Sequence, residues 1–195
     1  ILKDINNIPK LRAVLQELGK KTLEVGVFGD DDAEIVKIAR AHEFGVTIRP
    51  KNKKYLAIPL PPAKGTRPRD HKDLFIPRGT NVLAKKKGKN EFVPYFVLVE
   101  QVTIPERSFI RAGFDANVDD IVKKIDTLKD QVLELKINPK PFLEMIGKEL
   151  QGKIQKYMRD LKSPPNAPLT AANKGSSNPL IDEGNLLKSI DFKVK

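Results

Sequence analysis

The residues best suited to bind a partner lie between positions 49 and 89. This segment holds thirteen Lys or Arg residues and two Asp residues, so it accounts for the whole net charge of +11 of the 195-residue chain. Two runs are the densest part of it: Lys51, Lys53 and Lys54, and Lys85, Lys86, Lys87 and Lys89. Such groups can neutralise phosphates in sequence-independent DNA binding or dock on an acidic protein surface. A solvated face that prevents edge-to-edge aggregation stays open as the third interpretation.

The residue types of catalysis are sparse. The chain has no cysteine and two histidines, of which His42 lies on the apolar side of an expected helix and is typical of a core or interface residue. His71 follows Asp70 in a basic stretch, where a nuclease histidine is conceivable, but it lacks a second histidine and an acidic partner set. The run Asp30 to Asp32 supplies too few oxygens for calcium. We therefore expect neither an enzyme nor a bound metal or cofactor.

The run at Asp30 to Asp32 has a simpler interpretation as the start of a helix. Asp31 and Glu34 have the spacing of a capping box, and acidic side chains favour the positive end of a helix. This predicts a helix over 33–44, with Gly45 as its C-terminal cap.

Residues 164–195 have the composition of an arm. Four prolines, at 164, 165, 168 and 179, disfavour helix and sheet because each removes a backbone donor. A short helix is expected from Asp182, in which apolar side chains share a face. The candidate docking residues of the arm are Leu180, Ile181, Leu186, Leu187 and Ile190. We expect this face to add to another molecule.

The elements that position these residues follow from periodicity. Apolar spacing predicts a helix over 6–18 and a strand over 23–28. Between 46 and 93 we expect a basic β-rich insertion, with short strands at 55–60 and 74–77 and a hairpin that pairs 81–84 with 95–102 across the turn at 85–90.

Two long helices are expected after the insertion. From Glu106 to Lys136 apolar residues step by four and three, as in a heptad seam. A second apolar stripe runs from Phe142 to Leu161, and the short break between the helices favours an antiparallel hairpin. The seam can equally pack against a sheet or a neighbouring subunit. The expected fold is α+β: a small antiparallel β-sheet packed by a long helical hairpin, in one domain (1–163) followed by the extended arm (164–195).

Composition favours a protein that works in an assembly. Hydrophobic residues make up 39% and aromatic residues 6% of the chain, which is lean for an independent globule and fits burial against neighbours. No apolar run approaches the roughly 20 residues that span a bilayer. No signal peptide is recognisable, and we expect a soluble protein in the cytoplasm.

Three sets of motifs occur in order along the chain: EVGVFG at 24–29 with HEFG at 42–45, IPERSFIR at 104–111, and PLT at 168–170 with KGSS at 174–177 and LIDEGNLLKSI at 180–190. In this order they resemble motifs of the tail-completion, or head–tail joining, proteins of long-tailed bacteriophages. In the second motif Glu106 and Ser108 replace the usual Ala and Pro of the family. Together the motifs span most of the chain.

The resemblance implies a structural virion protein of the neck, assembled in the host cytoplasm. It implies a homo-oligomeric ring, with a hexamer as the expected form, through which the genome passes. The implied partners are head-side connector or portal-complex proteins and the tail terminator or tail tube, with non-specific duplex DNA as a possible further partner and no membrane. In this interpretation the arm clasps a neighbour, so deleting 164–195 is expected to abolish the ring and leave a folded monomer. The alternatives are a sequence-independent DNA-binding protein that uses 49–89 and a nuclease that uses His71.

Overall fold

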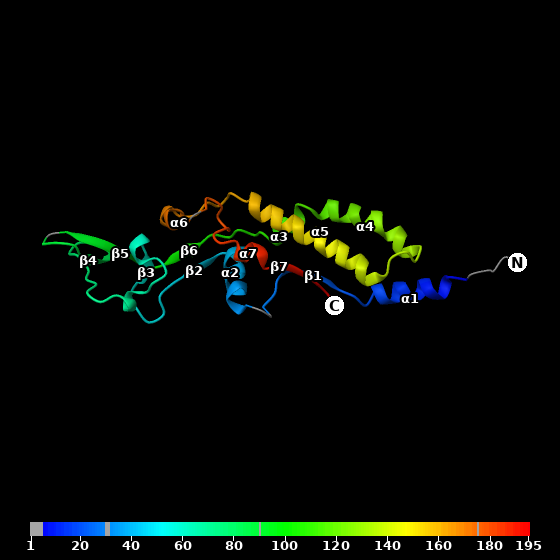
Figure 1. The fold of residues 1–195 in the computed structure, drawn as a ribbon, viewed down its shortest axis with the longest axis horizontal. Helices are drawn as coiled ribbons and strands as arrows, with labels where there is room; N and C mark the ends of the chain where they lie inside the picture. Colours follow the sequence, from blue (N-terminus) through cyan, green and yellow to red (C-terminus); the bar gives the residue numbers. More distant parts are fainter. Residues whose placement is uncertain (1–5, 30–31, 90, 175) are drawn as a thin grey trace.

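The computed structural model describes residues 6–29, 32–89, 91–174 and 176–195, and its fold is α+β, with small antiparallel sheets packed against helices (Figure 1). The molecule is elongated, with α1, α4 and α5 toward one end and the sheet of β3, β4 and β5 at the other. The elements are α1 (Ile8–Leu18), β1 (Leu23–Val27), α2 (Ala33–Phe44), β2 (Val46–Ile48), β3 (Leu56–Pro59), the 3-10 turns η1 (Pro61–Ala63) and η2 (Pro68–Asp70), β4 (Val82–Lys86), β5 (Phe92–Val99), β6 (Val102–Ile104), α3 (Arg111–Asp115), α4 (Val118–Leu133), α5 (Pro139–Asp160), α6 (Pro168–Asn173), α7 (Asn185–Lys188) and β7 (Ile190–Val194).

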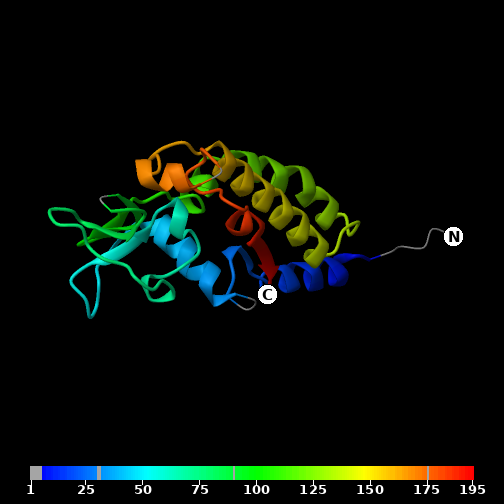
Figure 2. The ribbon, with the colours of Figure 1, turned by 60° about the vertical axis from the view of Figure 1, so that its left-hand side comes forward.

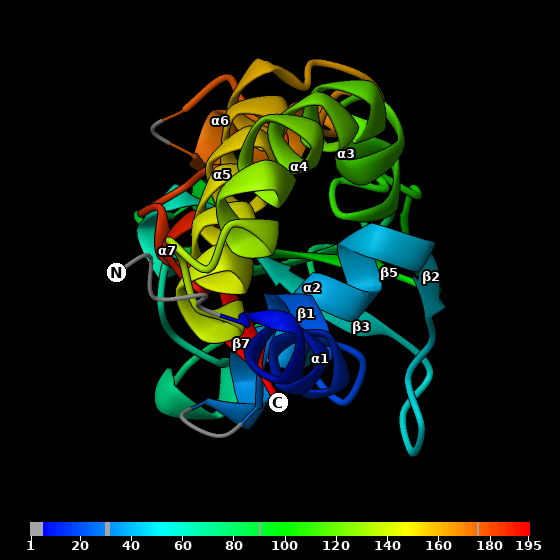
Figure 3. The same cartoon turned by 90° about the vertical axis from the view of Figure 1, so that its right-hand side faces the viewer.

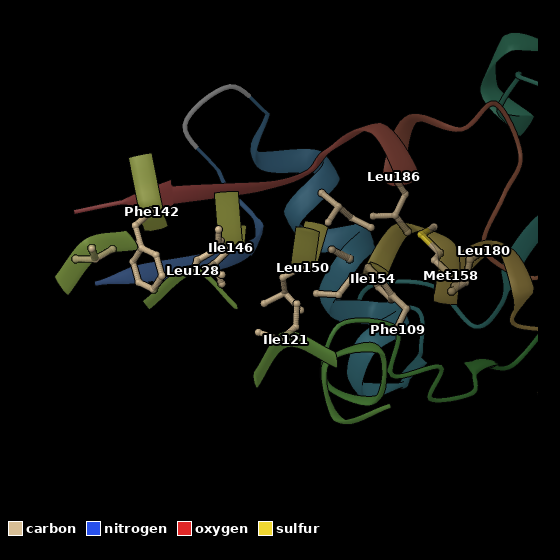
Figure 4. Packing of buried hydrophobic residues seen from close by; sticks show 13 residues of the cluster. Phe109, Ile121, Leu128, Phe142, Ile146, Leu150, Ile154, Met158, Leu180 and Leu186 are labelled. Atoms are coloured by element: carbon tan, nitrogen blue, oxygen red, sulfur yellow. The ribbon is translucent and has the colours of Figure 1, made fainter. Parts of the chain in front are cut away.

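Helix α5 is the centre of the core. Five side chains of its predicted stripe are buried, and the sixth, Leu161, packs against the same cluster after the helix has ended (Figure 4); the five are Phe142, Ile146, Leu150, Ile154 and Met158. Each such side chain contributes about 1.5–3 kcal/mol when it leaves water. The helix begins at Pro139, three residues before the predicted start, because a proline in the first turn removes an N–H that has no helical acceptor.

The predicted helix over 106–136 is wrong at both ends and in the middle. Residues 105–110 are non-helical, and α3 and α4 are separated at Ala116 and Asn117, where the Asn117 side chain donates to Gly113 O at 2.7 Å. Helix α4 packs on α5 in the expected hairpin (Figures 1 and 3). Ile121, Leu128 and Val132 of the seam are buried there, whereas other seam positions remain exposed.

A two-stranded ribbon covers another side of α5. Strand β1 pairs antiparallel with β7, from Leu23 opposite Val194 to Val27 opposite Ile190. Both strands contact α5. The approach is close because Gly147 of α5 carries no side chain: a Cβ there would lie 2.4 Å from the Phe192 ring. The strand β7 was not predicted, because its residues were assigned to the arm (164–195).

Helix α2 has the predicted bounds, and Gly45 is its C-cap. Its N-cap is Asp32, whose side chain accepts from the backbone N–H groups of Glu34 at 2.8 Å and Ile35 at 3.3 Å. Asp30 and Asp31 lie outside the described residues, so the capping box predicted for Asp31 does too.

The insertion is a three-stranded antiparallel sheet on a two-stranded stem. The stem pairs β2 with β6, where the chain enters and leaves (Figure 2). Beyond it the strand order is β3-β5-β4, with Lys86 opposite Phe92 at the hairpin end. The predicted hairpin forms with different bounds: β4 reaches Lys86 and β5 begins at Phe92, so the turn is shorter than the predicted 85–90, and β5 ends at Val99 before the separate strand β6. The strand predicted over 74–77 is a single bridge between Phe75 and Ala84. The insertion therefore extends past residue 93 to β6.

The C-terminal segment folds back onto the molecule. Helix α6 begins at Pro168, which lies in its first turn. At the other end of α6 the Asn173 side chain donates to Pro59 O of β3 at 2.9 Å. Gly184, at φ +82°, precedes α7, and β7 follows at Ile190. The expectation that the proline-rich part of the arm stays out of helix and sheet is therefore corrected, whereas the short helix expected from Asp182 is present as α7, beginning at Asn185.

Candidate interaction surfaces

A buried carboxylate joins the end of α2 to the start of α3. Glu43 is 4% exposed. Its carboxylate accepts hydrogen bonds from Ser108 Oγ at 2.8 Å and from the backbone N–H of Ile110 at 2.9 Å. It also accepts from the backbone N–H and Nε of Arg111, at 3.1 and 2.9 Å. Burial raises the pKa of Glu43, but these hydrogen bonds outweigh it and hold the pKa below its ordinary value.

A buried guanidinium ties the same region to the start of the C-terminal segment. Arg107 is 4% exposed. It donates from Nε to Pro164 O at 2.7 Å and from one terminal nitrogen to Pro165 O at 2.8 Å. Its other terminal nitrogen lies 3.4 Å from His42 Nδ1, and Arg107 N donates to His42 O at 2.7 Å. Burial, Arg107 and Lys174 lower the pKa of His42 to about 4, so the imidazole is neutral and accepts at Nδ1.

The glycine that follows Phe44 is required by its surroundings. Gly45 has φ +66°, a region that side chains disfavour. A Cβ there would lie 2.8 Å from Glu106 N and 3.2 Å from Ile104 O. The backbone after α2 thus passes directly against the segment before α3.

The segment after α6 caps the central helix. The Asn178 side-chain amide donates to carbonyls at the end of α5, with the shortest bond, 2.8 Å, to Arg159 O. Its oxygen accepts from the backbone N–H of Leu180 and Ile181. Lys174 Nζ donates to Asn178 O at 3.2 Å and Pro179 O at 3.1 Å, and burial lowers its pKa. Gly175 lies outside the described residues.

The five predicted arm-docking residues pack inside their own chain. Leu180, Leu186 and Ile190 belong to the buried core, and Ile181 and Leu187 are half-buried against it (Figure 4). The expectation that this face docks on a neighbour is corrected: its apolar surface is already covered by α5 and by neighbouring parts of the chain.

The two lysine runs of the insertion lie in different places. Lys51, Lys53 and Lys54 are exposed in the loop before β3, and the second run, at residues 85–89, forms the end of the β4–β5 hairpin. Of the second run Lys86, Lys87 and Lys89 are exposed, whereas Lys85 is half-buried with Nζ 5.2 Å from the centre of the Tyr95 ring. The sequence prediction treated the runs as one contact set, and the structure separates them into a loop and a hairpin tip.

The first run lines a shallow basic groove of about 440 Å³. Lys51, Lys53, Arg67 and Arg69 line it together with Tyr55. Tyr55 is 37% exposed. Arg67 and Arg69 were counted in the basic segment but not grouped with these lysines, because only folding brings η2 beside the loop.

The histidine considered for catalysis is held by its neighbours. His71 Nε2 lies 2.6 Å from Thr66 Oγ1, and its ring packs edge-on against Tyr95 and Phe96. Over the described ranges no three His, Asp or Glu side chains gather as metal ligands would. His71 thus has an evident packing role.

Comparisons of the chain with protein-family models, curated proteins and solved structures found no match. Among the helices of the described residues, none is both long and apolar enough to cross a membrane.

Proposed function

We propose that this chain is a structural protein of long-tailed bacteriophages that assembles with copies of itself into a ring at the head–tail junction. The observation that carries the proposal is that the first two sets of motifs behind the resemblance bond each other, and that the second also bonds the segment that leads into the third. Glu43 of the first bonds Ser108 and Arg111 of the second. Arg107 of the second bonds the proline segment that leads into the third. These residues are far apart in the sequence but bond one another in the fold. Such contacts support a fold shared with the phage proteins over a chance likeness of short motifs.

Exposed apolar side chains support an assembly. The helical part leaves large side chains uncovered on α1, α2, α4 and their flanks: Ile8, Leu15, Ile38, Phe44, Val118, Val122, Ile125 and Leu133. Ile8 is 68% and Phe44 59% exposed. Isolated exposed apolar residues are ordinary, but sets on neighbouring turns of one helix favour contact with other chains.

In the proposed neck the genome passes through the lumen of the ring, and a hexamer is the expected form. The ring contacts a head-side connector or portal-complex protein on one side and the tail terminator or tail tube on the other. This role in the virion needs shape, charge and self-association. It needs no catalytic group, cofactor or membrane, and we propose no enzymatic activity.

Reconstitution tests the proposed function. Heads and tails are prepared from particles whose assembly lacks this chain, the purified chain is added, and joined particles are counted by negative-stain microscopy. The proposal predicts that joining rises with added chain until it saturates. Heads and tails that stay apart, or that join equally well without the chain, contradict it.

A second candidate function is sequence-independent binding of duplex DNA. The observation that favours it is the groove of Lys51, Lys53, Arg67 and Arg69 around Tyr55. Neutralising phosphates releases counterions, so affinity should fall steeply with salt. Titration of the chain with a short random-sequence duplex at several salt concentrations measures this slope. A steep slope that Lys51→Glu/Lys53→Glu reduces supports it, whereas undetectable binding at low salt excludes it.

A further inference from the structure

A hollow with acidic walls lies between α2 and the C-terminal segment. Its volume is about 900 Å³. Five carboxylates line it, against three lysine ammonium groups; the acids are Asp32, Glu34, Asp182, Glu183 and Asp191. The folded-back segment that was expected to clasp a neighbour thus forms one wall of a concave surface.

Of the five carboxylates of this hollow, Glu34 pairs with Lys37 and Asp32 caps α2, which leaves the three of the C-terminal segment. Asp182, Glu183 and Asp191 are exposed, and none forms an ion pair within the described part of the chain. Lys174, one of the three lysines, donates to Asn178 O and Pro179 O, and the charge of Asp182 acts on it as well. An acidic wall that keeps its charge unpaired is able to bind a cationic partner.

The floor of the hollow adds apolar surface. Leu180 and Leu186 are buried below it, and Ile38 of α2 lines it while remaining 44% exposed. A partner that fits therefore presents cationic side chains with some apolar surface. In the part of the chain that the structure describes, the hollow opens to solvent.

An element with cationic and apolar side chains is present in the same chain, at the end of the molecule formed by the insertion. The tip of the β4–β5 hairpin presents Lys86, Lys87 and Lys89, and beside them Phe92 is 43% exposed. None of these three lysines forms an ion pair among the described residues. Figure 1 shows that the hairpin projects from one end of the long axis, away from α2 and α7, so one copy does not fill its own hollow.

We propose that the basic hairpin of one copy docks in the acidic hollow of the next copy. The hairpin and the hollow are different surfaces, so the contact is heterologous and repeats from copy to copy. Such a contact gives a ring where the rotation closes and an open chain where it does not. This rests on the proposed ring and assigns its subunit contact.

Charge reversal on each surface tests the contact in the full chain. Lys86→Glu/Lys87→Glu changes the hairpin, and Asp182→Lys/Glu183→Lys changes the hollow; all four side chains are exposed, so folding should be kept. Light scattering measures the mass of each. Wild type is expected to associate, and more weakly as salt rises from about 50 to about 500 mM. Each double variant alone is expected to weaken association tenfold or more, and the combined fourfold variant to recover it.

A mixture of the two double variants gives the sharpest result. In an equimolar mixture the intact hairpin of one variant meets the intact hollow of the other, and the reversed hairpin meets the reversed hollow. Association should therefore recover in the mixture, although each variant alone associates weakly. The matched controls change as much charge elsewhere: Lys51→Glu/Lys53→Glu in the groove and Asp119→Lys/Asp130→Lys on α4 should associate as wild type does.

The outcomes separate this contact from the proposed neck function. Double variants that associate like wild type, or a mixture that associates no more strongly than either double variant alone, overturn the contact and leave the neck function standing. A wild-type chain that stays monomeric at low salt also overturns the contact, although joining of heads and tails would still support the neck function. Association into open chains only, with no joining, keeps the contact and removes the neck function.

Discussion

Glu43 carries an unusual share of the polar contacts in the helical part. A buried carboxylate costs free energy unless its oxygens are fully bonded. Here the donors are the Ser108 hydroxyl and the backbone N–H groups of Ile110 and Arg111. The Arg111 guanidinium adds a positive charge, with Nε 2.9 Å from a carboxylate oxygen of Glu43. Arg111 Nη2 also donates to the backbone oxygen of Glu43 at 2.9 Å. The Arg111 side chain therefore bonds both the backbone and the carboxylate of Glu43.

Replacing this carboxylate by an amide should destabilise the fold. In Glu43→Gln an NH₂ group faces donors that need an acceptor, and the charge opposite Arg111 is lost. We expect the free energy of unfolding to fall by about 1–3 kcal/mol, measured by urea unfolding. The control is Glu100→Gln, an exposed residue, which should stay within about 0.5 kcal/mol of wild type. Equal losses in both variants contradict the role of Glu43.

His42 should make stability depend on pH. Its folded pKa of about 4 is below the ordinary value of 6.5, because burial and the charges of Arg107 and Lys174 disfavour the imidazolium. Between these values the unfolded chain binds more protons, so stability is present above pH 6.5 and is lost as pH falls toward 4. Between pH 7 and 5 the expected loss is about 2 kcal/mol.

Urea unfolding at several pH values measures this dependence. His42→Gln should flatten it, whereas His71→Gln leaves the surroundings of His42 intact and should keep it. A wild-type chain with constant stability over this range argues against a buried neutral His42.

At the scale of elements, α5 is the part that most others contact. Its close approach to the β1–β7 ribbon depends on Gly147, while Gly152 on the same helix faces open space. Gly147→Ala should cost about 1–3 kcal/mol, because the added methyl overlaps the Phe192 ring and Leu23. Gly152→Ala should instead stabilise by up to about 1 kcal/mol through helix propensity. Thermal unfolding of the two variants measures the difference, and the same sign for both rejects this packing.

The strand β7 is expected to be part of the fold and not a detachable clasp. Ile190 is fully buried and its neighbour Asp191 is exposed. Ile190→Ala should lower the free energy of unfolding by about 2–5 kcal/mol, and Asp191→Ala should change it little. Deletion of 164–195, expected from the sequence to leave a folded monomer, should instead abolish cooperative urea unfolding. A cooperatively folding deletion variant contradicts this account of β7.

Local patterns in the sequence predicted the elements whose periodicity is complete. Helix α2, the stripe of α5 and the β4–β5 hairpin were predicted because spacing, caps and a polar turn agree there. The C-terminal segment was mispredicted because proline content argues against helix interiors, whereas Pro168 occupies a first turn. The strand β7 depends on its partner β1, more than 160 residues away, and no local signal contains that pairing. The groove of Lys51 and Arg67 is likewise a product of folding.

At the scale of the whole molecule, charge is separated along the long axis. The insertion, with the whole excess positive charge, projects from one end, and the helical part holds the acidic hollow (Figure 1). When two different surfaces of one chain are complementary, each copy can bind the next in the same orientation, so the contact repeats head to tail. This arrangement favours a subunit of a larger assembly over a protein that acts alone.

The most direct test of this account is the native mass of the purified full chain. Light scattering with negative-stain imaging is applied to the chain alone and to its mixtures with heads and with tails. We predict a discrete closed ring, formed by the chain alone or on the tips of tails. A monomer that ignores both particles and binds duplex DNA in a salt-dependent way would contradict the account and favour the DNA-binding function.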